Sequence, residues 1–280
     1  MRIAVLGATG VLGRRVLPAL AGRGHEVVAV ARDPRRVDAR DGRIRAVPGD
    51  ILDPAALAAP LAGCDAVLHL ATAIPPPGGD WTMNDRVRRE GTRNLLAAAA
   101  AAHVRRYVQQ SVAMLLAGPR ERVADEDAPL APAPNLVSAV EMETLVRATP
   151  LDWVILRGGL FYGPGTGRWQ AWNAAARERL AALPGDGGDS VSLVHVDDMA
   201  TAVVLAAESR LARVVLNVVD DAPVTYAELF GHLARRHGAP PPAPGGPPGL
   251  ASFRVSNARA RQSLGWSPRY ADYRSGSAAE

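Results

Sequence analysis

The chain has 280 residues, of which 48% are hydrophobic and 21% charged, which is typical of a folded globular protein and excludes a disordered one. Its 32 basic residues are all arginines and are balanced by 28 acidic residues. They form no basic stripe interleaved with aromatics, so we expect no nucleic-acid partner. Apolar stretches are too short for a membrane span, and Cys64 is a single cysteine, so no disulfide or cysteine metal cluster can form. We expect a cytoplasmic protein that binds no membrane and no metal.

Short β-branched runs alternate with longer helical patterns through the first two thirds of the chain. The predicted strands are residues 3–6, 27–30, 44–47, 66–70, 107–110 and 153–156. The predicted helices are residues 11–21, 54–61, 85–102 and 136–148. Right-handed crossovers join strands in such an alternation, so the pattern predicts an α/β fold with a doubly wound parallel sheet.

Glycine- and proline-rich loops interrupt this rhythm after residue 157. A helix is expected at about 171–183, and the segments 192–196, 198–208 and 214–218 are expected to return to the sheet. We therefore predict a main domain of residues 1–160 together with about 190–220. The predicted remainder is a smaller, discontinuous C-terminal substrate-binding cap, residues 161–189 and 221–275, followed by a tail, residues 276–280.

The first predicted strand leads into the loop GATGVLG, residues 7–13, and then into an apolar helix. Glycines at its first, fourth and seventh places let the backbone turn sharply, approach a pyrophosphate and pack helix against strand. The helix N-terminus adds free N–H groups that attract phosphate. This context predicts dinucleotide binding rather than a purely structural turn, with contacts from Gly7, Thr9, Gly10, Val11, Leu12 and Gly13.

The end of the second predicted strand bears on the type of cofactor. Domains that bind NAD usually place an acid there for the ribose hydroxyls, whereas this chain has Ala31 followed by Arg32. A guanidinium can bind a 2′-phosphate through two hydrogen bonds. The alternative is a solvated arginine cluster in which Asp33 caps a turn. The pattern favours NADP(H), with NAD(H) as the alternative.

Several further motifs follow the glycine loop in order. They are GDILD at 49–53, DAVLHLA at 65–71, EGTRNLL at 90–96, LRGGLFYGPG at 156–165, VHVDDMA at 194–200 and a segment at 256–268 that ends LGWSP. With the glycine loop, they resemble the extended short-chain dehydrogenase/reductase superfamily (the NAD-dependent epimerase/dehydratase group) over nearly the whole chain. The resemblance implies a Rossmann-type fold. It also implies cofactor contacts from Asp50, Ile51, Leu70, Ala71, Ser111, Gly158, Gly159 and Leu160.

The catalytic motif departs from that family. Its members usually carry Ser or Thr after the fifth strand and then Tyr-x-x-x-Lys, in which tyrosine is the acid/base and lysine lowers its pKa and binds ribose. Aligned on Glu143, the tyrosine and lysine places fall at Asn135 and Ala139. The serine place falls at Val112, beside Ser111. Asparagine cannot ionise and the chain contains no lysine, so the usual acid/base is absent.

Another departure lies in the helix that precedes the Gly-Thr pair at residues 91–92. Family members usually have an asparagine three residues before that glycine, where this chain has Arg88.

Few residues could replace the missing acid/base. Tyr162, in FYGPG, would act as an acid/base or position substrate, and Ser111 would hydrogen-bond a substrate carbonyl or only the backbone. Asn135 would position substrate through its amide. Trp169 would form the wall of an apolar substrate pocket or only pack the cap. His195 fits a structural role better than a catalytic one.

We therefore expect an atypical NAD(P)-dependent oxidoreductase or epimerase-like enzyme that acts on a small organic substrate. Hydride transfer at a carbonyl, alkene or imine would use water or substrate as the proton source. One alternative is a non-catalytic dinucleotide-binding redox sensor, and another is a non-redox isomerase, dehydratase or cyclase. A homodimer is left open.

Overall fold

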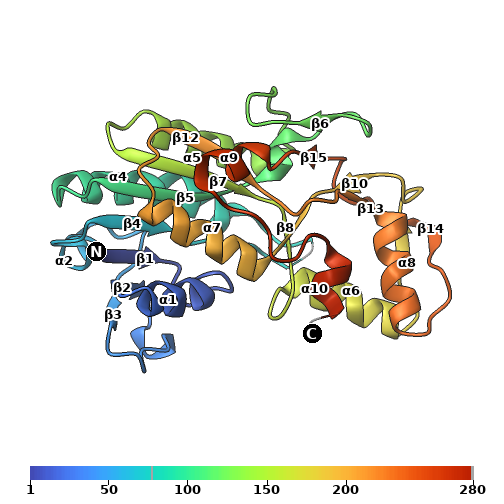
Figure 1. Cartoon of the computed structure of the whole chain (residues 1–280), viewed down its shortest axis with the longest axis horizontal. Helices are drawn as coiled ribbons and strands as arrows, with labels where there is room; N and C mark the ends of the chain where they lie inside the picture. The colour runs from blue at the N-terminus through green and yellow to red at the C-terminus, as the bar shows by residue number, and fades with distance from the viewer. Residues whose placement is uncertain (77, 279–280) are drawn as a thin grey trace. The chain divides into compact units, whose positions relative to one another are not determined.

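The computed structural model describes residues 1–76 and 78–278, and it divides into two compact units. Unit 1 contains residues 1–111, 132–157 and 200–216. Unit 2 contains residues 112–131, 158–199 and the chain from residue 217 onward. Figure 1 follows the chain by colour from the N-terminus to the C-terminus and labels many helices and strands of both units.

Unit 1 is built on a seven-stranded sheet with the order β12-β7-β5-β4-β1-β2-β3. Strands β3, β2, β1, β4 and β5 pair in parallel, as predicted. The chain runs outward from β1 in both directions, so the order switches between β1 and β4, and ligands of such sheets bind beyond the strand ends at that switch. The strands are β1 Arg2–Leu6, β2 Glu26–Ala31, β3 Ile44–Pro48, β4 Ala66–His69, β5 Arg106–Val112, β7 Asp152–Gly158 and β12 Val214–Val218.

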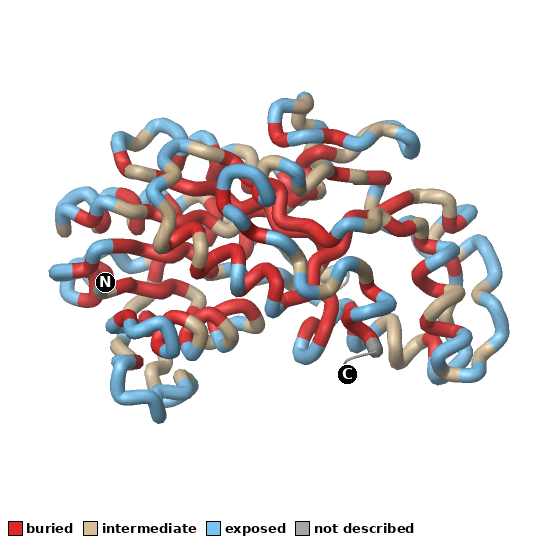
Figure 2. The backbone as a smooth tube through the Cα atoms, viewed as in Figure 1, coloured by how far each residue is buried: buried red, intermediate tan, exposed pale blue. Residues whose placement is uncertain are grey.

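Helices flank this sheet, and the strands are almost completely buried, which is why they consist of near-continuous apolar runs. In the tube of Figure 2 the central strands are buried, whereas the connection after β2 is exposed. The main helices are α1 Gly13–Gly22, α2 Ala58–Leu61, α3 Thr82–Arg86, α4 Thr92–Ala101, α5 Val137–Arg147 and α7 Val196–Glu208. Short 3₁₀ turns are η1 Pro34–Arg36, η2 Pro54–Ala56, η4 Ala113–Leu116 and η5 Pro134–Leu136.

The helix predicted over residues 85–102 begins earlier, at Thr82, and is not regular throughout. Between α3 and α4 the backbone forms a π-helical turn, η3, over Val87–Gly91. A Cβ on Gly91 would lie 3.0 Å from Cγ2 of Ile51, so glycine lets this helix approach the chain after β3 closely. π-helical turns inside α-helices occur often at functional sites.

Unit 2 consists of four two-stranded sheets and four helices among the described residues. Its aromatic side chains, with Tyr162, Trp169 and Phe253 among them, pack into one apolar core. The strands are β6 Val123–Ala124, β8 Leu160–Tyr162, β9 Ala182–Pro184, β10 Ser190–Val191, β11 Leu193–His195, β13 Val224–Thr225, β14 Ala243–Gly246 and β15 Arg254–Val255. The helices are α6 Gly167–Arg177, α8 Tyr226–Arg236, α9 Ala258–Leu264 and α10 Tyr273–Ala278.

Two segments that we expected in the main domain group with unit 2. Residues 112–131 contain β6, which pairs with β15, and residues 190–199 contain β11, which pairs with β8. The predicted return of residues 192–196 to the main sheet is therefore not observed. The predicted return of 214–218 is observed, as strand β12. No helix among the described residues is long and apolar enough to span a bilayer.

Candidate active site

The glycine loop joins β1 to α1 and is packed tightly on one side only. Gly7 has a positive φ of 87°, and a Cβ there would lie 2.6 Å from the backbone nitrogen of Ala71. A Cβ on Gly13 would lie 2.2 Å from the carbonyl oxygen of Gly7. A Cβ on Gly10 would meet only the Gly7 carbonyl oxygen, at 3.2 Å. Gly7 and Gly13 are therefore needed by the fold, whereas the space over Gly10 is open to a ligand.

The first turn of helix α1 faces this loop, and Leu12 at its N-cap provides no side-chain hydrogen bond. The backbone nitrogens of Arg14 and Arg15 donate to the carbonyl oxygens of Gly10 and Leu12, each at 3.0 Å. The N–H groups of Leu12 and Gly13, which bond no other described residue, can bind phosphate oxygens. The guanidinium of Arg14 donates through Nε to the carbonyl oxygen of Thr9 at 3.0 Å, which helps to fix the loop. These features fit the pyrophosphate of a dinucleotide.

Arg32 and Asp50 line one open pocket of about 500 Å³ in unit 1. Arg32 is exposed at the end of β2 and makes no hydrogen bond or ion pair with another described residue. Asp33 instead caps the turn η1 and pairs with Arg35, with an Nε–Oδ1 distance of 2.9 Å. The turn-capping role expected of Asp33 is thus observed, and it leaves Arg32 available to a ligand. The other lining residues are Pro48, Gly49, Ala55, Ala56, Ala59 and Pro60.

A second pocket of about 370 Å³ lies beside the glycine loop. Ala8 of the loop and three arginines, Arg14, Arg36 and Arg40, contribute to its lining. Arg40 forms an ion pair with Asp38 on the surface. The lining thus combines these three arginines with two acids, Asp38 and Asp41.

Ser111, at the carboxyl end of β5, is buried against a carboxylate. Its hydroxyl donates to Oε1 of Glu143 at 2.7 Å. The guanidinium of Arg157 donates to both oxygens of Glu143, at 2.9 and 2.7 Å, and all three side chains are buried. A serine hydroxyl has one proton to donate, and the hydrogen bond to Glu143 uses it. Leu70 and Ala71 directly follow β4 in the same unit, where Gly7 touches their backbone.

Asn135 lies in the turn η5 just before α5, and Ala139 is fully buried in that helix. Arg88 contacts this segment: its Nη1 donates to the Asn135 carbonyl oxygen at 3.2 Å and to the Ser138 hydroxyl at 3.1 Å. Ser138 in turn donates to Asp85 at 2.6 Å. Burial lowers the pKa of the Arg88 guanidinium. The two departures from the family pattern are thus neighbours in space, which the sequence did not reveal.

Tyr162 and Trp169 pack against one another in the core of unit 2. The Tyr162 hydroxyl donates to the carbonyl oxygen of Asp272 at 3.0 Å, and its ring centroid lies 5.5 Å from that of Trp169. Both residues are buried, and burial raises the pKa of the Tyr162 phenol. The side chain of His195 meets Tyr162 edge-on, with ring centroids 5.1 Å apart. These contacts fit side chains that stabilise the core of unit 2. That is the alternative to an acid/base role for Tyr162 and to a wall of the substrate pocket for Trp169.

The predicted cofactor residues Gly158, Gly159 and Leu160 lie where β7 leads into β8. The Gly159 nitrogen donates to the Val218 carbonyl oxygen at 3.0 Å, and a Cβ on Gly159 would lie 2.6 Å from the carbonyl oxygen of Ser192. Leu160 is buried in the core of unit 2. Their backbone is therefore held closely by neighbouring strands.

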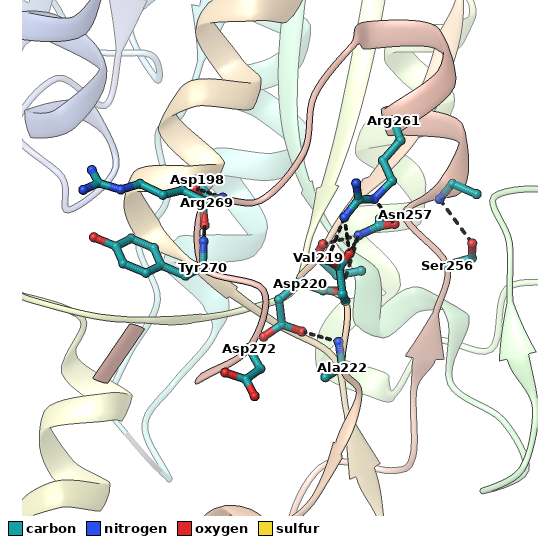
Figure 3. A network of polar contacts seen from close by, with 12 residues as sticks. Asp198, Val219, Asp220, Ala222, Ser256, Asn257, Arg261, Arg269, Tyr270 and Asp272 are labelled. Atoms are coloured by element: carbon teal, nitrogen blue, oxygen red, sulfur yellow. Dashed lines mark hydrogen bonds and ion pairs between the residues drawn. The ribbon is translucent and has the colours of Figure 1, made fainter. Parts of the chain in front are cut away.

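Asp220, at the end of β12, is a buried acid that sequence analysis missed (Figure 3). It accepts a hydrogen bond from the Ala222 nitrogen at 3.3 Å, whereas its Oδ2 atom has no hydrogen-bond partner among the described residues. Burial raises the pKa of this carboxyl to about 9. Another acid drawn in Figure 3, Asp198, accepts hydrogen bonds from the nitrogens of Arg269 and Tyr270 at 2.9 and 3.0 Å. In the sequence, Asp220 and Asp221 follow a strand as two adjacent acids, a pattern that does not indicate burial.

The described residues contain no group of three or more His, Cys, Asp or Glu side chains arranged to hold a metal ion. His69 hydrogen-bonds the Thr92 hydroxyl at 3.1 Å, and burial lowers the pKa of its imidazole to about 3. That histidine is therefore a neutral core residue.

Comparison with known proteins agrees with this geometry. A family model described as NAD(P)H-binding matches residues 7–209. The chain is 39% identical to the 3-diazoavenalumate denitrifying reductase of a Streptomyces species, over 99% of each chain. Among solved structures, MoeE5 in complex with UDP-glucuronic acid and NAD is similar with a TM-score of 0.86 and 26% identity, covering 100% of this chain and 97% of the other.

A second solved structure carries the superfamily name. It is a short-chain dehydrogenase/reductase superfamily protein from Agrobacterium tumefaciens with bound NAD, similar with a TM-score of 0.81 and 27% identity over 100% of this chain and 96% of that one. The glycine loop, the sheet order and these similarities lead to one conclusion: the chain belongs to the NAD(P)H-binding family, enzymes of the extended short-chain dehydrogenase/reductase superfamily.

Proposed function

We propose that the chain is an NADPH-dependent reductase that replaces the diazo group of an aromatic carboxylate with hydrogen, the group reacting as the aryl diazonium cation. The observation that carries this proposal is the segment Asn135 to Ala139, where the family's tyrosine and lysine would stand and this chain has no ionisable side chain. The 39% identity to a denitrifying reductase of a diazo compound supports the choice of substrate.

A diazonium acceptor suits a site that has lost its proton donor. Bound NADPH would supply a hydride, so that overall an aryl C–N bond is replaced by C–H, dinitrogen leaves, NADP⁺ forms and no proton is consumed. A carbonyl acceptor would instead give an alkoxide that must be protonated, and a positioned general acid usually contributes about 10²- to 10⁴-fold to such a step. Asn135 cannot supply that proton, and the Ser111 proton is held by Glu143.

The protein would then bind and orient the cofactor. The glycine loop and the first turn of α1 would hold the pyrophosphate, and Asp50 would lie at the adenosine end. Arg32 would bind the 2′-phosphate, with Arg14 and Arg36 adding positive charge from the neighbouring pocket. This charge is the reason that we propose NADPH over NADH.

Tyr162 and Trp169 of unit 2 have a supporting role in this proposal. The Tyr162 hydroxyl is committed to the Asp272 carbonyl oxygen, and Trp169 is buried beside it. We therefore assign them to the stability of unit 2 and not to proton transfer. Asn135 keeps its predicted role of positioning substrate through its amide.

The test compares two substrates that share one ring and differ in the reacting group. 3-Carboxybenzenediazonium and 3-carboxybenzaldehyde are each incubated with NADPH, and cofactor oxidation, dinitrogen and arene are measured, with the reaction lacking enzyme subtracted. We expect dinitrogen to match the NADPH oxidised and the aldehyde to react at least about a hundredfold more slowly. Faster reduction of the aldehyde, or dinitrogen release without NADPH oxidation, would contradict the proposal.

A further inference from the structure

We infer that Arg88 and Asn84 form a binding site for the carboxylate of the substrate. The inference rests on the proposed function for the identity of the substrate, but the site itself is argued from the contacts of these two residues. Both belong to the helical segment α3–η3 of unit 1, one turn apart.

Arg88 is a buried cation that no carboxylate of the described residues contacts directly. It is 6% exposed, and its hydrogen bonds, both from Nη1, go to neutral oxygens of Asn135 and Ser138. The nearest acid, Asp85, accepts from Ser138 and pairs with Arg89 at 3.6 Å. A buried charge without such a partner is costly, so an anionic ligand is the partner that this guanidinium lacks.

The free edge of Arg88 has the geometry that a carboxylate needs. Its Nε and Nη2 atoms make no hydrogen bond with another described residue. These two donors point the same way and can bind both oxygens of one carboxylate. Arg157 uses this same pair of atoms to hold the Glu143 carboxylate, at 2.9 and 2.7 Å.

Asn84 supplies a second, independent donor. It is fully buried, its Oδ1 accepts from the Ala73 nitrogen at 2.9 Å, and its Nδ2 has no partner among the described residues. Residues four apart on a helix lie on one face, so Asn84 lies on the face of Arg88. An unpaired amide donor and an unpaired guanidinium edge on one helix face suit a single anionic group.

An aromatic ring lies next to the guanidinium of Arg88, which favours an aromatic or other apolar carboxylate. The Trp81 ring centroid lies 6.0 Å from Cζ of Arg88. Three large apolar side chains are exposed next in sequence to residues of the site: Ile74 beside Ala73, Met83 beside Asn84 and Val137 beside Ser138. The glycine loop and Arg32 already provide for the phosphates of the cofactor, so we assign the anion at Arg88 to the substrate.

The test measures binding and does not depend on turnover. Isothermal titration calorimetry compares cinnamate with cinnamamide, which match in size and planarity and differ in charge, on the enzyme loaded with NADP⁺. We expect the wild type to bind cinnamate at least about tenfold more tightly than cinnamamide. The variant Arg88→Gln should lose that preference and keep its affinity for cinnamamide and for NADP⁺.

Matched variants separate the outcomes. Arg86→Gln, two residues earlier on the helix and paired with Glu90 on the surface, should change nothing. Asn84→Leu should weaken cinnamate by a smaller factor than Arg88→Gln. Arg88→Lys keeps the charge but not the planar fork, and it should bind cinnamate with intermediate affinity, which covers the case in which Arg88→Gln does not fold.

Three results would overturn the inference. The first is equal affinity of the wild type for the two probes, and the second is an unchanged cinnamate affinity in Arg88→Gln. The third is a loss of NADP⁺ affinity in Arg88→Gln as large as its loss of cinnamate affinity, which would assign the site to a cofactor phosphate. If only the proposed function failed, the results would differ from these three. The wild type would still prefer cinnamate, but the enzyme would oxidise NADPH with neither 3-carboxybenzenediazonium nor its methyl ester.

Discussion

The guanidinium of Arg88 donates to the backbone carbonyl oxygen of Asn135 across 3.2 Å. In the alignment that we propose from the sequence, the first residue stands where the family has asparagine and the second where it has tyrosine. A pair of substitutions that meet in space suggests one altered site rather than two independent losses. For the function that we propose, a buried cation and the absence of a tyrosine proton donor suit a substrate that carries an anionic group and whose reduction consumes no proton.

Arg32 should determine the choice between the two nicotinamide cofactors. We expect NADPH to bind more tightly than NADH by roughly tenfold to a hundredfold, since a charge-assisted hydrogen bond contributes roughly 1.5–3 kcal/mol. Arg32→Ala should remove this difference, whereas Arg35→Ala should not, because Arg35 pairs with Asp33 on the surface. Titration of both cofactors against the wild type and each variant measures the difference in affinity. Equal affinities in the wild type would contradict the role of Arg32 as the ligand of the 2′-phosphate.

Gly10 should tolerate no side chain, because a Cβ there would enter the space of the pyrophosphate. Gly10→Val should abolish cofactor binding and leave the far-ultraviolet circular dichroism intact, since only the Gly7 oxygen lies near such a Cβ. Gly22→Ala, at the other end of α1 with nothing within 4 Å, is the control and should bind normally. Normal cofactor binding by Gly10→Val would show that the loop does not hold the phosphates.

Asn135 and Tyr162 should each matter modestly to turnover. Asn135→Ala removes one amide contact of roughly 0.5–1.5 kcal/mol, at most about tenfold in rate. Tyr162→Phe removes the hydrogen bond to Asp272 and should lower the free energy of unfolding by about 1 kcal/mol with a similarly small effect on rate. Steady-state kinetics and urea unfolding measure both. A loss beyond a hundredfold in Tyr162→Phe, at unchanged cofactor affinity, would restore its acid/base role.

Asp220 should make the stability of the protein fall as the pH rises. Its pKa is raised to about 9, so the folded state keeps this proton after the unfolded chain has lost it. The contribution is full below the unfolded pKa near 3.9 and is lost progressively as the pH rises towards about 9. At most, one such group changes the free energy of unfolding by about 1.4 kcal/mol per pH unit.

The variant Asp220→Asn isolates that effect, because the other titrating groups are common to both proteins. Relative to the variant, the wild type should lose on the order of 2–4 kcal/mol of unfolding free energy between about pH 5 and about pH 8. Urea unfolding at the two pH values measures this difference. A difference that does not change with pH would mean that Asp220 is ionised in the folded protein.

The sheet and the glycine loop could be predicted because their signals are local. A β-branched run, a GATGVLG loop and an apolar helix follow one another within the first 22 residues, and the structure places them as predicted. The partners of β6 and β11 lie far along the chain, in β15 and β8. No local pattern reports such pairings, so the sequence predicts neither the pairing of β11 with β8 nor that of β6 with β15.

The individual site residues show the same limit. Arg32 could be recognised from its place after a strand, but Ser111 could be interpreted only once its bond to Glu143, 32 residues away, was known. Arg88 could be noticed as a departure, yet its contact with Asn135 spans 47 residues. Hydrogen bonds of this kind depend on tertiary packing, which periodicity and motif spacing do not encode.

Isotope transfer tests the central claim most directly. The enzyme is supplied with 3-carboxybenzenediazonium and with NADPH that carries deuterium at both positions of C4, in ordinary water, and the arene product is examined by mass spectrometry and NMR. We expect one deuterium at the carbon that bore the diazo group and one dinitrogen released per cofactor oxidised. Two results together would contradict direct hydride transfer. The product would lack deuterium in this experiment, and with unlabelled NADPH in heavy water it would carry solvent deuterium at the carbon that bore the diazo group.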